Sequence, residues 1–122
     1  MQKTFGFPRS LRLLTAADFR TVFNDVQVKA PSSECLLLAR PNQFQKPRIG
    51  FILSKKNVKR AVHRNRVKRF TREYLRLNQA ELPGLDIIFM GRKGIDQLDD
   101  QHLQLLIATQ FKKLSKRAQK LG

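Results

Sequence analysis

Residues 48–91 constrain the fold more than any other part of the chain. "RIGFILS" (48–54) has the composition of a strand, and "LDIIFMG" (85–91) is continuously apolar, which is typical of a buried strand. Residues 58–78, between them, carry apolar side chains at helical spacing. Because parallel strands need a long crossover, usually a helix, we expect these two strands to be parallel. Gly50 inside the first strand predicts a bulge or a close backbone approach.

The flanking segments supply further elements on both sides of this unit. A helix is expected from about residue 15 to residues 24–26, strands at 27–30 and 34–40, and a last helix with an apolar stripe over 103–114. The order is therefore helix, three strands, helix, strand, helix. One sheet with helices packed mostly on one face is an α+β fold, and 122 residues suit a single domain.

Polar residues mark where the first two helices begin. Thr15 is expected as the N-cap of the first helix, with Asp18 completing a capping box. Leu14 and Phe19 occupy the two positions of a hydrophobic staple around that cap. Asn57 is the expected N-cap of the second helix.

The charge of the chain is large and concentrated in two segments. Lys and Arg number 25 against 9 Asp and Glu, a net charge of +16. Residues 55–76 contain ten basic side chains and one acid, and the tail over 112–122 contains five basic side chains and no acid. Self-repulsion of this size predicts a polyanionic partner, either nucleic acid or an anionic membrane.

The sequence argues against the membrane. Its apolar runs, such as "CLLLA", are far shorter than the ~20 residues of a spanning helix, and "MQKTFGFPRSLRLL" lacks the apolar core of a secretory signal. Cys35 is the single cysteine and cannot form an internal disulfide. We therefore expect a cytoplasmic protein that binds nucleic acid.

The second helix carries a basic ridge that is expected to face outward. Its core arc is expected at Val67, Phe70, Tyr74 and Leu77. Like charges spaced i, i+4 destabilise a helix by roughly 0.2–0.5 kcal/mol per pair, so a plain solvated face is the weaker interpretation and polyanion binding the stronger one. The ridge consists of Arg60, Arg64, Lys68, Arg72 and Arg76.

Charge alone does not separate RNA from DNA, but two features favour RNA. Arg outnumbers Lys in the centre of the ridge segment, and nine Phe and one Tyr are available to stack on unpaired bases. By spacing alone, Phe19 and Phe23 fit core packing better than base stacking.

Catalytic chemistry is nearly absent from the sequence. His63 and His102 belong to no motif that pairs them with a nucleophile. The carboxylates Asp96, Asp99 and Asp100 open the last predicted helix, so capping explains them better than metal binding. We expect no metal site formed by protein side chains.

Four segments together carry a family resemblance. "KRAVHRNRVKRFTREYLR", centred on Arg64-Asn65-Arg66, resembles the arginine-rich signature of the bacterial ribonuclease P protein component. "FPRSLRLLTAADFRTVF", "RIGFILSKKNVKRA" and "DIIFMGRKG" resemble the opening, third strand and fourth strand of that family, in the same order. The resemblance covers nearly the whole chain.

The resemblance implies a two-layer α/β sandwich of αβββαβα order, with a four-stranded mixed sheet and a left-handed crossover. It also implies the small subunit of an endoribonuclease that removes the 5′ leader from precursor tRNA. In that ribonucleoprotein the RNA subunit performs the hydrolysis with Mg²⁺. The protein binds the RNA subunit and the leader, broadens substrate use and promotes Mg²⁺ binding, with one protein per RNA.

The resemblance also implies which residues form the two RNA-binding surfaces. Leu37 stands where some members of the family carry an aromatic side chain, which puts base stacking at that position in question. The surface for the RNA subunit would comprise Arg60, Arg64, Asn65, Arg66, Lys68, Arg69 and Arg72. The leader cleft, between the first helix and the sheet, would comprise Phe19, Phe23, Leu37, Lys55, Arg92 and Lys93.

Two other function classes stay open from the residues alone. A ribosomal or DNA-architectural protein would account for the charge, and would bind duplex DNA as well as structured RNA. An autonomous nuclease would need Asp96, Asp99 and Asp100 for activity.

Overall fold

The computed structural model describes residues 14–44, 46–82 and 84–121 of the chain. Within these residues the helices and strands follow the predicted order, and two short 3₁₀ turns, η2 (Gln79–Glu81) and η3 (Ile95–Gln97), flank the fourth strand. The helices and strands are α1 (Ala16–Asn24), β1 (Val28–Pro31), β2 (Cys35–Pro41), β3 (Arg48–Ile52), α2 (Ala61–Leu77), β4 (Leu85–Gly91) and α3 (Asp100–Gln119).

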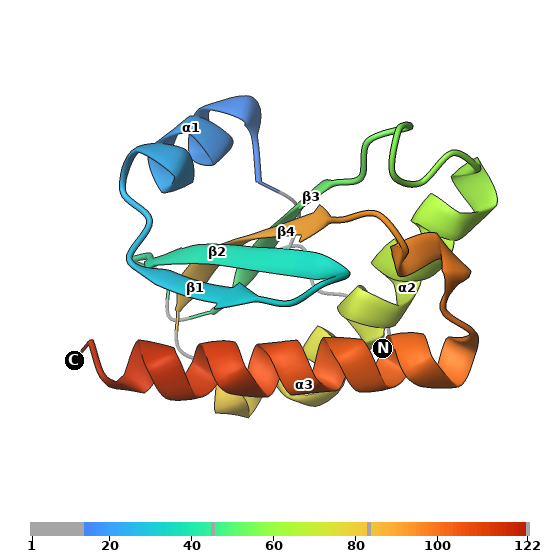
Figure 1. Cartoon of the computed structure of the whole chain (residues 1–122). Coiled ribbons are helices and arrows are strands. Elements are labelled where there is room, and N and C mark those ends of the chain that lie inside the picture. The colour runs from blue at the N-terminus through green and yellow to red at the C-terminus, as the bar shows by residue number, and fades with distance from the viewer. Residues whose placement is uncertain (1–13, 45, 83, 122) are drawn as a thin grey trace, which may run out of the picture.

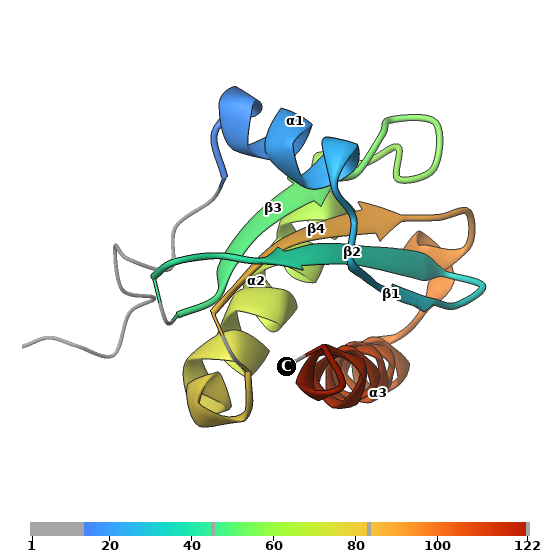
Figure 2. The same cartoon turned by 90° about the vertical axis from the view of Figure 1, so that its left-hand side faces the viewer.

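The four strands form one mixed sheet in the order β1-β2-β4-β3. β1 and β4 each pair antiparallel with β2, and β3 pairs parallel with β4 from Arg48 opposite Asp86 to Ile52 opposite Met90. Helices α2 and α3 cover one face and α1 lies on the other (Figures 1 and 2). Helix α2, which connects β3 to β4, lies on the face opposite α1. The parallel pair and the α+β fold are confirmed.

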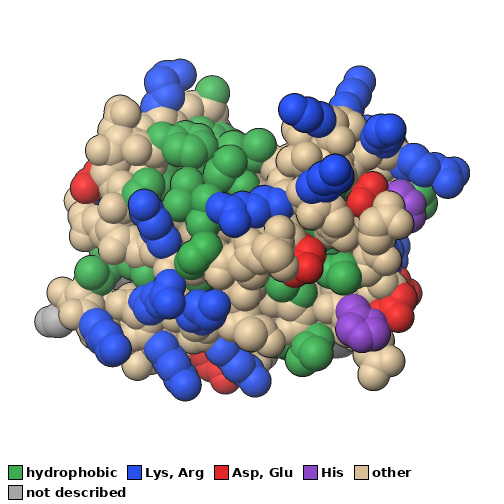
Figure 3. Space-filling model, in the orientation of Figure 1, with side chains coloured by type: hydrophobic (Ala, Val, Ile, Leu, Met, Phe, Trp, Pro, Cys, Tyr) green, Lys and Arg blue, Asp and Glu red, His purple; other side chains and the backbone are tan. Residues whose placement is uncertain are grey.

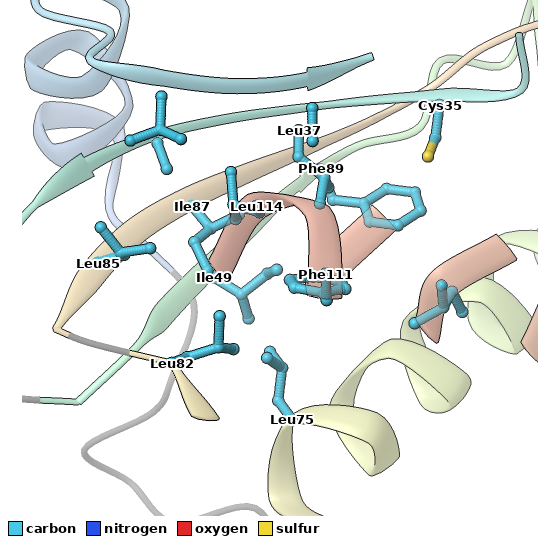
Figure 4. Packing of buried hydrophobic residues seen from close by; sticks show 14 of the residues in the cluster. Cys35, Leu37, Ile49, Leu75, Leu82, Leu85, Ile87, Phe89, Phe111 and Leu114 are labelled. Atoms are coloured by element: carbon cyan, nitrogen blue, oxygen red, sulfur yellow. The ribbon is translucent and has the colours of Figure 1, made fainter. Parts of the chain in front are cut away.

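The main core lies between the sheet and helices α2 and α3. Strand alternation sends Leu37, Ile49, Ile87 and Phe89 to this face, where Phe111 of α3 meets them (Figure 4). All five side chains are fully or almost fully buried. This core fixes the position of α2 relative to the sheet.

A smaller cluster lies on the α1 face of the sheet. Leu14, Val22, Leu38 and Ile88 are buried there, and several larger apolar side chains around them are only partly covered. Phe19 lies over Gly50, where an added Cβ would come within 2.4 Å of the Phe19 Cζ. The close approach predicted at Gly50 is therefore confirmed, and its cause is the ring of Phe19.

The caps of α1 and α3 form as predicted. The Thr15 Oγ1 accepts a bond from the Asp18 N–H at 3.2 Å, and the Thr15 N–H donates to Asp18 Oδ2 at 2.9 Å. That backbone bond is the main cause of the lowered pKa of Asp18. A lowered carboxylate pKa stabilises the fold at neutral pH, and this contribution is lost as the pH falls through that pKa. Asp99 caps α3 by accepting from the His102 N–H at 2.8 Å.

Two predictions for α2 are wrong. The helix begins at Ala61, with Arg60 as N-cap, because Asn57 instead donates its side-chain amide to the Gly91 carbonyl at 3.2 Å. Leu77, expected in the core, is 65% exposed, and Leu75 is buried in its place.

The Gly50 contact yields a stability prediction. Gly50→Ala should lower the free energy of unfolding by about 1–3 kcal/mol, because the new methyl group forces the Phe19 ring off the sheet. Urea unfolding measures the change. In a Phe19→Leu background the same substitution should cost much less, because the shorter side chain leaves room. Equal costs in both backgrounds would contradict the contact.

Candidate nucleic-acid interface

The basic residues of α2 flank its buried stripe. Val67, Thr71 and Leu75 are buried, and the ridge residues Lys68 and Arg72, each one position later, are half-buried beside them. The prediction that the whole ridge points outward is therefore wrong for Lys68 and Arg72. The ridge lies on the side of the edge strand β3, where the Arg72 Cζ is 5.8 Å from the ring centroid of Phe51. The most exposed arc of the helix contains Asn65, Arg69, Glu73 and Leu77.

Several of these basic side chains are held by contacts that leave their charge uncompensated. The Arg64 Nη1 donates to the carbonyls of Val58 at 2.8 Å and Lys59 at 3.0 Å, which fixes the turn before the helix. Arg69 lies over the ring of Phe70. Within the described ranges, no carboxylate forms an ion pair with the members of what we call the α2 cluster. The α2 cluster consists of Arg60, Arg64, Lys68, Arg69 and Arg72.

Arg66, in the same sequence motif, points in another direction. Its Nη1 donates to Asp100 Oδ1 at 2.8 Å and its Nη2 to the Leu98 carbonyl at 2.6 Å. The side chain is only 15% exposed. Arg66 therefore ties α2 to the start of α3, a role that the sequence pattern did not predict.

A hydrophobic hollow opens between α1 and the loop that leads into α2. Figure 3 shows hydrophobic side chains gathered there, with Lys and Arg around them. Its floor is formed by apolar residues of three strands, and Phe23, one turn after Phe19 on α1, is 46% exposed. We call this surface the α1 cleft. Its partly buried apolar residues are Phe19, Leu36, Ile52 and Met90.

The prediction that Leu37 lines this cleft is wrong. Leu37 is fully buried in the core under α2 and α3, on the opposite face from Phe19. Successive side chains of a strand point to opposite faces, so Leu36 occupies the cleft position instead. Leu36, Ile52 and Met90 were not predicted to line the cleft. Side chains alternate between the two faces of a strand, so knowing the face of one residue in each strand would have indicated them.

Three predicted cleft residues follow the ends of the two parallel strands. Lys55 comes after β3, and Arg92 and Lys93 come after β4. Because the strands are parallel, all three are brought to the same end of the sheet, and all three are exposed. Arg92 is fixed further by donating its Nη1 to the Ser32 carbonyl at 2.9 Å.

A partly buried ion pair fixes α1 over the sheet. The Arg48 Nε and Nη2 donate to the two carboxylate oxygens of Asp86 at 2.9 and 2.8 Å, and Nη2 also reaches Asp18 of α1 at 3.4 Å. The bond to Asp86 raises the pKa of Arg48. The pair joins residues 38 positions apart, so no local pattern in the sequence signals it.

Within the described ranges, no three of the His, Cys, Asp and Glu side chains converge in a way that could hold a metal ion. Asp99 and Asp100 are engaged as the α3 cap and the partner of Arg66. No helix in the same ranges is sufficiently long and apolar to span a bilayer.

The contacts of Arg66 predict a structural role that can be measured without RNA. Arg66→Ala should lower the free energy of unfolding by about 1–3 kcal/mol, because two charge-assisted hydrogen bonds are lost. Arg66→Lys should restore little of the lost stability, because an ammonium group lacks the planar fork that reaches both acceptors. The exposed Arg69→Ala is the control, and urea unfolding of the free protein should show almost no change. Equal losses from the Arg66 and Arg69 variants would contradict this role.

Comparison with known proteins identifies the family. The sequence model of the family described as Ribonuclease P matches residues 7–119. The chain is 47% identical over 115 residues to the ribonuclease P protein component of Chromohalobacter salexigens, covering 94% of this chain and 90% of that protein. It is 50% identical over 112 residues to that of Ectopseudomonas mendocina, covering 92% and 81%.

Solved structures agree in fold. A mutant Staphylococcus aureus RNase P protein with defective mRNA degradation activity superposes with a TM-score of 0.75 at 22% identity, covering 91% of this chain and 90% of that one. The RNase P protein of Thermotoga maritima gives 0.72 at 25% identity, covering 84% and 96%. The chain therefore belongs to the ribonuclease P protein family, the protein subunits of the endoribonuclease that processes the 5′ ends of tRNA.

Proposed function

We propose that this chain binds the RNA subunit of ribonuclease P through the α2 cluster and the 5′ leader of precursor tRNA through the α1 cleft. The observation that carries the proposal is the physical separation of two different surfaces. One is the α2 cluster, whose members form no ion pair with a carboxylate in the described part of the chain, and the other is an apolar hollow on the opposite face of the sheet. Folded RNA and a flexible single strand need these two kinds of surface.

The α2 cluster suits the backbone of a folded RNA. Arginine presents a planar fork of donors that matches phosphate oxygens. Arg64 and Arg72 are already oriented by the Val58 and Lys59 carbonyls and by the Phe51 ring, so less side-chain entropy is lost on binding. Arg66 supports this surface from behind by holding α2 on α3.

The α1 cleft suits unpaired nucleotides. Single-strand-binding grooves combine aromatic side chains that stack on bases with basic residues that follow the phosphates. Phe23 is exposed enough to stack, and Phe19 is held in place by Gly50. Lys55, Arg92 and Lys93 supply positive charge at the end of the sheet.

The protein's part in the reaction follows from these positions. We assign the phosphodiester hydrolysis to the RNA subunit and assign the reaction's Mg²⁺ mainly to RNA phosphates. The protein, one per RNA, holds the leader beside that RNA and offsets the repulsion between two polyanions, which favours Mg²⁺ binding at the RNA.

The first test concerns the leader. In the complex reconstituted with the cognate RNA, Phe23→Ala should weaken binding of precursor tRNA roughly 5- to 150-fold, the loss expected from one stacked base. Binding of mature tRNA, which has no leader, should stay unchanged. Leu77→Ala removes another exposed apolar side chain, which lies outside the cleft, and is the control. Equal effects of Phe23→Ala on precursor and mature tRNA would sink the assignment of the cleft.

The second test concerns the RNA subunit. Arg60→Gln with Arg69→Gln should weaken assembly and reduce the slope of log affinity against log salt by about 0.7–0.9 for each lost phosphate contact. Lys46→Gln with Lys112→Gln removes the same charge from exposed positions elsewhere and should alter the slope much less. If both pairs change the slope equally, overall charge rather than the α2 cluster drives assembly.

A further inference from the structure

A second group of basic residues takes part in neither proposed surface. It lies at the β1 edge of the sheet, far from the α2 cluster at the β3 edge. Figure 3 shows Lys and Arg gathered over α3, below β1, with further basic side chains between them and the hydrophobic hollow. We call this group the β1–α3 surface. It consists of Lys29, Lys113, Lys116, Arg117 and Lys120.

Backbone carbonyls of β1 and its turn hold three cations in a row. The Arg117 Nη1 donates to the Lys29 carbonyl at 2.7 Å, and the Lys113 Nζ donates to the Pro31 carbonyl at 3.4 Å. Arg92 donates to the next carbonyl, that of Ser32. Two carbonyls on the same edge of a strand are about 6.6 Å apart. The row therefore leads from α3 to Arg92, a proposed cleft residue.

Protection of the sheet edge explains only part of this arrangement. Cationic side chains on an edge strand prevent pairing with another chain, and Lys113 and Arg117 serve that purpose. Lys29 and Lys120, however, are exposed and donate no side-chain hydrogen bond within the described ranges. In those ranges no carboxylate forms an ion pair with any member of the surface. Glu81 lines a shallow hollow with Lys112 and Lys116 and forms no ion pair with either within the described ranges.

Lys29 connects this surface to the α1 cleft. Its neighbours Val28 and Ala30 belong to the core under α3, so alternation places the Lys29 side chain on the α1 face. Its partner in β2 is Leu38, a member of the cluster beneath α1. Lys120, the C-cap residue of α3, lies three residues after Arg117 and on the same side of the helix.

We propose that the β1–α3 surface binds the 5′ leader upstream of the nucleotides held in the α1 cleft. This inference rests on the proposed function. The RNA subunit, bound at the β3 edge through the α2 cluster, holds the cleavage site, so the leader enters the α1 cleft from that edge. A strand that crosses the apolar face from that edge leaves the sheet over β1, where Lys29 and the row of cations meet its phosphates.

The test compares two leader lengths in the reconstituted complex. One precursor tRNA has a leader that ends within the cleft, and the other carries about ten further unpaired nucleotides, within the site sizes of single-strand-binding grooves. Lys29→Gln with Lys120→Gln should weaken binding of the long-leader precursor about two- to tenfold. For this precursor, the slope of log affinity against log salt should fall by about 0.7 for each lost phosphate contact. The short-leader precursor should be affected much less.

The control pair, Lys46→Gln with Lys112→Gln, should change the binding of the long-leader and short-leader precursors to the same extent. Equal weakening of both precursors by the Lys29 and Lys120 pair would overturn the proposal, because the partner would then be the tRNA body or the RNA subunit. No weakening of either would also overturn it and would leave an acidic protein as the partner to test. If the wild-type complex cleaves neither precursor, the proposed function itself fails, which is a distinct result.

Discussion

One short helix has to cover a whole face of a four-stranded sheet, and the rest of the molecule depends on this mismatch. A helix of nine residues is about 14 Å long, so α1 hides only part of the apolar surface that β2, β3 and β4 present to it. The other face has two longer helices and a closed core. The uncovered apolar strip is the α1 cleft, and Arg48, bound to Asp86 and Asp18, keeps α1 in the position that leaves it open.

Helix α2 combines two demands that conflict. It must bury Val67, Thr71 and Leu75 to complete the core, and it must keep a row of like charges that repel one another. Contacts outside the helix offset part of that repulsion by holding Arg64 of the row and the nearby Arg66. Arg66 is bound by the first turn of α3, and Arg64 by the carbonyls just before α2. The charges that remain uncompensated face the edge strand and solvent, where RNA phosphates can reach them.

Local patterns predicted most of the elements and few of the contacts between them. The Thr15 and Asp18 cap, the four strands and the parallel pair follow from spacing over a few residues. Asn57 was assigned to the wrong partner because a carbonyl of β4, 34 residues away, competes for its amide. The resemblance placed Leu37 on the wrong face, and the run of apolar residues could not correct it, because such a run does not tell which of two neighbours points to which side.

The sequence by itself determined the order of elements and the concentration of positive charge on α2 and α3, because periodicity and composition are local properties. The resemblance of four segments to known sequences indicated the family. Tertiary structure alone decided which basic side chains are free to contact RNA and which are held by contacts within the protein. It turned Arg66 inward to Asp100, 34 residues away, and laid Arg117 on the Lys29 carbonyl, 88 residues away. The direction of a side chain depends on what packs beside it, and that is settled only when distant segments meet.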